Sequence, residues 1–202
     1  MMETAEQAHA RAREIVRDVL VEAFSASATP FVPVPLVDDW MFGRLLRRIA
    51  GKVLARHALT SPPELPQVIV AAYFDAGSSS VVKSVAVGAA RFVVRKLAIV
   101  LDVKKSYDVF GKSIVFALAL DLAAANGWLH EASAERVGAA VHRTLLVVGS
   151  GAIESLGRAG RDAFKRGGPK QLGAAMAAEV ERARAQLEPV LRHELRLPSD
   201  YS

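Results

Sequence analysis

Cysteine is absent from this sequence of 202 residues. Its absence excludes a disulfide scaffold, a thiolate metal site and a cysteine nucleophile, and it suits a reducing compartment such as the cytoplasm. The sequence also lacks the run of about 20 apolar residues that a transmembrane helix needs, because Asp121 interrupts the longest candidate, residues 113–129. Glu3 and Glu6 lie near the N-terminus with no apolar stretch around them, which argues against a secretory signal. We therefore expect a cytoplasmic chain that does not cross a membrane.

Motifs that bind metals or nucleotides are missing as well. None of the five histidines has the His-Glu-x-x-His spacing that places two metal ligands on one helix face. Gly111-Lys112-Ser113 resembles a phosphate-binding loop, but the glycine that such a loop needs five residues earlier is Ser106. Residues 144–157 imitate a dinucleotide-binding turn, but Glu154 occupies the position of its third glycine. The sequence predicts no metal, no cofactor and no enzyme, with a turn between helices at 111–113 and a helix break at 149–151. Catalysis by residues far apart in the sequence is an alternative that motifs leave open.

Basic residues outnumber acidic ones only modestly. The net charge is +5, from 26 lysines and arginines against 21 acidic residues, and 18 of the 26 are arginine. Arginine binds carboxylates and phosphates in bidentate fashion, so the excess is compatible with an acidic protein or an anionic membrane. A dedicated nucleic-acid module shows a denser cluster of positive charge, so we expect no nucleic-acid partner.

Hydrophobic residues make up 51% of the chain, which is enough for one domain with a substantial core. Their spacing predicts an all-α fold, a single multi-helix, bundle-like domain over residues 1–202. We expect an N-terminal helix in 1–28, a proline-rich apolar segment at 29–37, a helical core at 38–168 and a C-terminal helix in 169–202. Residues 79–103 and 113–125 are apolar almost all round, which is typical of two helices at the centre of a bundle. Residues 66–74 fit either a short helix or a buried strand.

Two acidic residues have structural explanations in the sequence. Asp38 precedes a predicted helix at 39–58 and should cap its N-terminus. Asp121 lies in an otherwise uncharged apolar helix, so it needs a partner if it is buried. We expect that partner to be Arg91 or Arg95, in a structural ion pair.

The predicted helix 39–58 has no acidic residue after Asp39 and carries five basic residues, Arg44, Arg47, Arg48, Lys52 and Arg56. At 100° per residue, Arg44, Arg47 and Arg48 lie opposite an apolar arc. Lys52 lies at the margin of that arc, and Arg56 drifts into it. A basic amphipathic helix with an aromatic residue at one end is typical of proteins that lie on an anionic membrane.

We predict that these five basic residues bind an anionic partner, either an anionic membrane surface or an acidic protein. On a membrane, the apolar contact would come from Phe31, Val34 and Trp40, in and just after the proline-rich segment. The alternative is that the apolar arc packs into the core and the arginines are only solvated. A second basic cluster, which Glu154 and Asp162 offset, comprises Arg158, Arg161, Lys165, Arg166 and Lys170.

The run Pro33-x-Pro35-Leu36-x-Asp38, followed by an amphipathic helix, resembles the Pro-x-Pro-Gly-x-Asp opening of a bacterial helical family of unknown function. This chain has Leu36 where that family usually has glycine, and the resemblance covers about a third of the chain. Members of that family occur beside or fused to small GTPase-like domains and are often described as membrane-associated. The resemblance implies a helical protein with a small GTPase or a membrane as its partner, and it carries over no catalytic residue.

Together these features predict a non-enzymatic helical interaction or scaffold protein in the cytoplasm, free or peripheral at the inner membrane face. The alternative is a helical domain that binds a lipid or a hydrophobic small molecule in its apolar interior. The sequence leaves the oligomeric state and the identity of the partner open.

Overall fold

The computed structural model describes residues 5–27, 37–57, 63–77, 94–167 and 172–196, and within these ranges the chain is all-α with no strand. In chain order the helices are α1 (Ala5–Ser27), α2 (Val37–Arg56), α3 (Leu65–Gly77), α4 (Val94–Ala125), α5 (Trp128–Glu131), α6 (Ala134–Gly167) and α7 (Leu172–Glu194). The predicted fold class is therefore confirmed. The proline-rich segment, apart from its last residue, lies outside the described residues.

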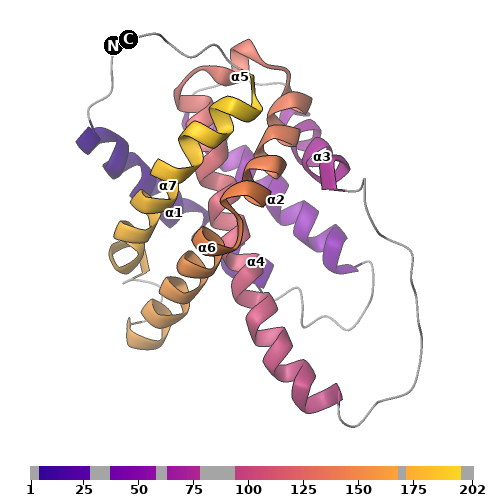
Figure 1. The fold of residues 1–202 in the computed structure, drawn as a ribbon, viewed down its shortest axis with the longest axis vertical. Coiled ribbons are helices and arrows are strands. Elements are labelled where there is room, and N and C mark those ends of the chain that lie inside the picture. Colours follow the sequence, from indigo (N-terminus) through magenta and orange to yellow (C-terminus); the bar gives the residue numbers. More distant parts are fainter. Residues whose placement is uncertain (1–4, 28–36, 58–62, 78–93, 168–171, 197–202) are drawn as a thin grey trace.

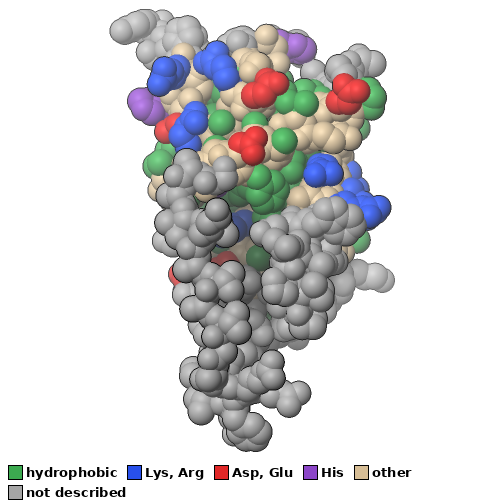
Figure 2. Space-filling view, turned by 90° about the vertical axis from the view of Figure 1, so that its right-hand side faces the viewer, with side chains coloured by type: hydrophobic (Ala, Val, Ile, Leu, Met, Phe, Trp, Pro, Cys, Tyr) green, Lys and Arg blue, Asp and Glu red, His purple; other side chains and the backbone are tan. Residues whose placement is uncertain are grey.

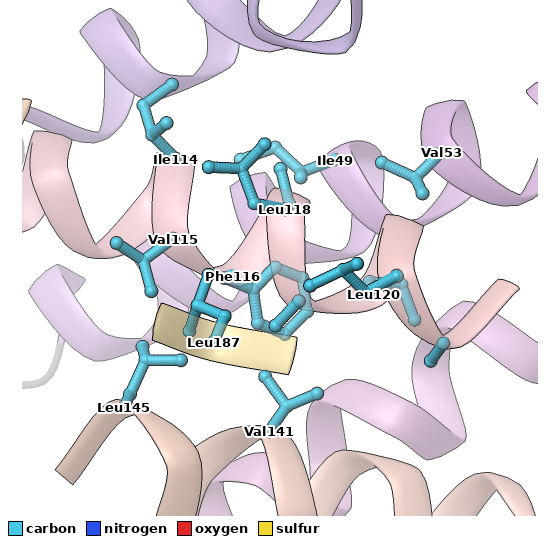
Figure 3. Packing of buried hydrophobic residues seen from close by; sticks show 14 of the residues in the cluster. Ile49, Val53, Ile114, Val115, Phe116, Leu118, Leu120, Val141, Leu145 and Leu187 are labelled. Carbon is cyan, nitrogen blue, oxygen red and sulfur yellow. The ribbon is translucent and has the colours of Figure 1, made fainter. Parts of the chain in front are cut away.

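Helix α4 is the centre of the bundle, and α1, α2, α6 and α7 pack around it (Figure 1). Its turns from Ile114 to Leu122 are almost completely buried, as expected for a helix that is apolar on every side. Figure 3 shows Leu118 of α4 beside Ile49 of α2, while Phe116 lies toward Val141 of α6. Full burial of such side chains contributes about 1.5–3 kcal/mol each, so this part of α4 holds the bundle together.

The prediction of two central helices separated by a turn at 111–113 was wrong. Gly111-Lys112-Ser113 lies inside α4, which runs without a break from Val94 to Ala125. Gly111 serves close packing, because a Cβ atom at this position would lie 2.2 Å from the carbonyl oxygen of Ile153 in α6. A single glycine without a neighbouring proline weakens a helix by only about 1 kcal/mol, which the tertiary contacts offset. The predicted helix 79–103 falls partly on residues 78–93, which lie outside the described residues.

Residues 66–74, which fit a helix or a strand equally well, form α3. Its buried residues Ile69, Val70 and Tyr73 follow helical spacing, and α3 packs on α6 and α2. Helix α2 begins at Val37, so Asp38 lies in its first turn, two positions after the N-cap position, and the predicted cap at Asp38 was wrong.

The predicted break at 149–151 is confirmed. Gly149 has φ 37° and ψ −134° inside α6, so the helix runs in two parts that meet at this residue. A residue with a side chain is strained at positive φ, which explains why glycine stands here. The C-terminal helix is α7, which contains Pro189 and runs alongside α6 (Figure 1).

Candidate functional site

Helix α2 has one face in the core and one in solvent. Leu46, Ile49 and Val53 are at most 1% exposed and pack on the bundle. The opposite face presents the exposed side chains of Arg44, Arg47 and Arg48, as the helical geometry predicted. The apolar arc is thus already buried in the protein, and only the charged face of this part of α2 is available to a partner.

The other two basic residues of the predicted set hold α2 against α1. Lys52 Nζ lies 2.8 Å from Glu22 Oε2 and also donates to the backbone oxygen of Asp18. Arg56 donates from Nη1 to Asp18 Oδ2 at 2.9 Å and from Nη2 to Glu14. These pairs join residues 30 to 42 positions apart, and they give both cations a structural role. The exposed basic surface of α2 is therefore narrower than the sequence predicted.

We call Arg44, Arg47 and Arg48 the α2 arginine face. These residues are three and four positions apart, so their Cβ atoms lie about 5–6 Å from one another on one side of the helix. Gly51 continues the same face, and a Cβ atom there would have nothing within 4 Å. A partner could therefore approach the helix backbone next to the arginines. Of the other predicted contacts, Phe31 and Val34 lie outside the described residues, and the Trp40 side chain is not described.

On the face of the molecule in Figure 2, Lys and Arg side chains gather in two places, and acidic side chains lie between them. The second basic cluster of the sequence is largely neutralised where the structure describes it. Arg158 pairs with Glu154 at 3.7 Å, and Arg161 pairs with Asp162 at 3.0 Å. The side chains of Lys165 and Arg166 and the whole of Lys170 lie outside the described residues. This cluster is thus a less favourable place for an anionic partner.

Asp121 is fully buried, and its described ion-pair partners are His57 and Arg184. Its Oδ1 lies 2.7 Å from His57 Nε2, and its Oδ2 lies 3.5 Å from Arg184 Nη1. Arg95 begins the same helix that ends near Asp121, roughly 39 Å away at 1.5 Å per residue, so it cannot reach the carboxylate. Arg91 lies outside the described residues. The Asp121 cluster joins α4, the end of α2 and α7, and the contacts with His57 and Arg184 explain how the core tolerates a carboxylate.

A pocket of about 630 Å³ lies where the start of α6 meets the end of α7. Its lining residues are Arg136, Arg143, His193, Glu194 and Arg196. Arg136 donates from Nη2 to the Leu195 carbonyl at 2.6 Å, and Arg143 donates from Nε to Glu194 Oε2 at 2.6 Å. Sequence reasoning missed this group because its members come from two helices that are distant in the chain.

A second, more apolar pocket of about 330 Å³ lies beside the break in α6 and includes Leu145, Leu146 and Ile153. Leu146 is 69% exposed, but a single exposed leucine is common on folded domains and does not by itself indicate a binding site. The charged residues of this pocket alternate in sign: Asp108, Lys112 and Glu154. This groove therefore does not match the anionic partner that the sequence predicts.

His142 of α6 packs edge-on against Tyr73 of α3, with ring centroids 5.0 Å apart. Its Nδ1 atom is buried without a hydrogen-bond partner among the described residues. Burial lowers the pKa of His142 below its ordinary value, and the positive charges of Lys112 and Arg143 lower it further. Burial likewise raises the pKa of Tyr73 to about 12. The two rings are therefore uncharged packing partners at neutral pH.

Comparison of the chain with models of protein families, with curated proteins and with solved structures finds no match to any of them. Within the described residues, no group of three His, Asp or Glu side chains is arranged to hold a metal ion. The described helices also include none with the length and hydropathy needed to span a bilayer. The functional argument therefore rests on the geometry of the charged surfaces.

Proposed function

We propose that this chain is a non-enzymatic helical interaction protein that docks through the α2 arginine face onto an acidic surface of another protein. The observation that carries the proposal is the orientation of α2. Its apolar arc is buried in the core, and Arg44, Arg47 and Arg48 point together into solvent. The sequence contains no carboxylate among residues 40–56, so the acidic residues of α2 are confined to its first turn, at Asp38 and Asp39.

The burial of the apolar arc favours a protein partner over a membrane. A helix that lies in the membrane interface inserts its apolar face, and here that face is occupied by the bundle. The three arginines alone would contribute about 1 kcal/mol each at an anionic surface, or about 3 kcal/mol together. That corresponds to an association constant of roughly 10² M⁻¹, well below the roughly 10⁴ M⁻¹ of a single myristoyl anchor. A stable membrane attachment would need a second anchor.

An acidic protein surface makes better use of the same three side chains. Each guanidinium can form two parallel hydrogen bonds with a carboxylate, and such charge-assisted pairs are about twice as strong as neutral hydrogen bonds. The spacing of three and four residues matches carboxylates at the same spacing on an acidic helix. Gly51 leaves room for the partner beside the arginines. A small GTPase, which the family resemblance implies, is included in this proposal as one possible acidic partner.

The alternative of a lipid or small molecule inside the bundle receives no support from the described part of the chain. The interior around α4 is filled by its own side chains, and Ile114, Phe116 and Leu120 are completely buried among neighbours. Asp121 pairs with His57 and Arg184 in that interior, so we assign it a structural role.

The test compares two triple variants with the same change in net charge. One replaces Arg44, Arg47 and Arg48 by glutamine, and the control replaces the exposed Arg17, Arg158 and Arg182. The control residues pair only with neighbours on their own helices at the surface, so both variants should remain folded. The probes are poly-L-glutamate and vesicles of phosphatidylcholine with phosphatidylglycerol, each at several salt concentrations.

We expect wild type and control to bind poly-L-glutamate with similar affinity, and the α2 variant to lose most of this binding. Equal binding by the two variants would show that general charge, and not the α2 arginine face, is responsible. Strong vesicle binding that depends on the α2 residues would instead assign the surface to a membrane.

A further inference from the structure

The pocket between the start of α6 and the end of α7 gathers more positive charge than the fold requires. Arg136 and Arg143 lie two helical turns apart on α6, and His193 and Arg196 come from the end of α7 and just beyond it. Among the described residues of the lining, Glu194 is the one carboxylate. Counted without His193, the described lining has three guanidinium groups and one carboxylate, which leaves a net charge of +2.

Two of the arginines are held in place and still have donors to spare. A guanidinium carries five N–H donors. Arg136 uses one of them on the Leu195 carbonyl, and Arg143 uses two groups on Glu194, through Nε to the carboxylate and through Nη2 to the backbone oxygen. These bonds to the end of α7 fix both side chains at the edge of the pocket. The remaining N–H groups are therefore positioned in advance for an anionic ligand.

The backbone conformation of Arg196 is a second observation that indicates a functional site. Its φ is 51°, and it is the one residue other than glycine with positive φ in the described part of the chain. This is the position after a helix where glycine is usual, because a side chain is strained there. Within the described residues the Arg196 side chain makes no hydrogen bond or ion pair that would compensate for the strain. Strain of this kind clusters at functional sites.

We propose that this pocket binds a phosphomonoester dianion, with Arg136, Arg143 and Arg196 as its ligands. A phosphomonoester carries a charge of about −1.5 to −2 at pH 7, which balances the net charge of the lining. Its three terminal oxygens suit the planar forks of several arginines. The volume of about 630 Å³ lies within the usual range for small-molecule sites and exceeds the needs of a bare phosphate ion. The ligand is thus a molecule that carries the phosphate, either a soluble compound or a lipid with a phosphate headgroup.

The decisive variant is Arg196→Gly. Glycine is the residue that φ 51° favours, and the Arg196 side chain holds no other described residue in place. The variant removes one ligand of the proposed site without weakening the fold, so its melting temperature should not fall. The control is Arg182→Ala, which changes the net charge equally at an exposed position of α7, where Arg182 pairs with Glu179.

Binding is measured on the full chain by calorimetry and by NMR of the arginine Nε–H groups, with inorganic phosphate and glycerol 3-phosphate as probes. Vesicles that contain phosphatidic acid, or phosphatidylglycerol for comparison, are tested by co-sedimentation. We expect saturable binding of glycerol 3-phosphate or of phosphatidic acid vesicles, weakened about tenfold or more by Arg196→Gly and unchanged by Arg182→Ala. The probe that binds identifies a soluble ligand or a lipid headgroup. The proposal is overturned if neither probe binds at millimolar concentration, or if the two variants bind equally well.

Discussion

Replacement of Asp121 by alanine should be among the most damaging single substitutions in this protein. Asp121 is completely buried, and the side chains of its partners His57 and Arg184 are only 14% and 13% exposed. Removal of one member of a buried ion pair leaves an uncompensated charge and typically costs 3–5 kcal/mol. Because domains of this kind are stable by about 5–15 kcal/mol, the loss would be a large share of the total. Urea denaturation followed by circular dichroism measures it directly.

Asp18→Ala is the matched control, because it also removes a carboxylate that pairs with an arginine, Arg56, but at a position where Asp18 is 43% exposed. A surface pair of this kind contributes about 0–1 kcal/mol. A double-mutant cycle of Asp121→Ala with Arg184→Ala should give a coupling energy of about 0.5–3 kcal/mol. If Asp121→Ala cost no more than Asp18→Ala, the reasoning about the buried cluster would be refuted.

Two further predictions concern close packing and pH. Gly111→Ala places a Cβ atom 2.2 Å from the backbone oxygen of Ile153 and should destabilise the fold by about 1–3 kcal/mol or more. Gly51→Ala places its Cβ atom in open space on a helix, so it should be neutral or stabilise the fold by up to about 1 kcal/mol. Thermal melts of both variants provide the comparison, and equal effects would contradict the tight crossing of α4 and α6. The lowered pKa of His142 means that the unfolded chain takes up a proton near pH 6.5 and the folded chain only at lower pH. The free energy of unfolding should therefore decrease as the pH falls from about 7 to 5. This decrease should be smaller in a His142→Gln variant. If the variant and the wild type showed the same pH dependence, the lowered pKa of His142 would be contradicted.

The sequence was sufficient to predict the features that depend on local periodicity. The apolar character of residues 113–125 correctly indicated a central helix, and the 100° spacing of Arg44, Arg47 and Arg48 correctly placed them opposite the buried arc. The break at 149–151 was predicted because two glycines lie close together there, and the structure places it at Gly149. The turn at 111–113 was wrong because a glycine in a sequence does not reveal whether it bends the chain or admits a neighbouring helix.

Contacts between distant parts of the chain could not be predicted in the same way. Lys52 and Arg56 are basic residues of α2, like the three residues of the α2 arginine face. Carboxylates of α1, more than 30 positions earlier in the chain, nevertheless bind Arg56. Only the packing of α1 on α2 reveals this contact. Arg184 left a usable signal, because it falls between Val180 and Leu187 on the buried face of α7, where an arginine needs an acidic partner. The pocket of Arg136, Arg143 and Arg196 left no signal in the sequence, because it exists only where the start of α6 meets the end of α7.

The central claim is that the α2 arginine face is a docking surface for an acidic protein, and site-specific photo-crosslinking in cells tests it most directly. A photoreactive residue at Gly51 would stand on this face with open space around it. The same residue at the exposed Ala185 of α7 serves as the control position. Each is placed in the wild-type chain and in the variant with Arg44, Arg47 and Arg48 replaced by glutamine.

The account predicts a discrete crosslinked protein from position 51 that is absent from position 185 and lost in the glutamine variant. The captured protein should carry clustered Asp and Glu residues at the crosslinked segment. Crosslinks that persist in the glutamine variant, or that occur only with lipid, would contradict the claim.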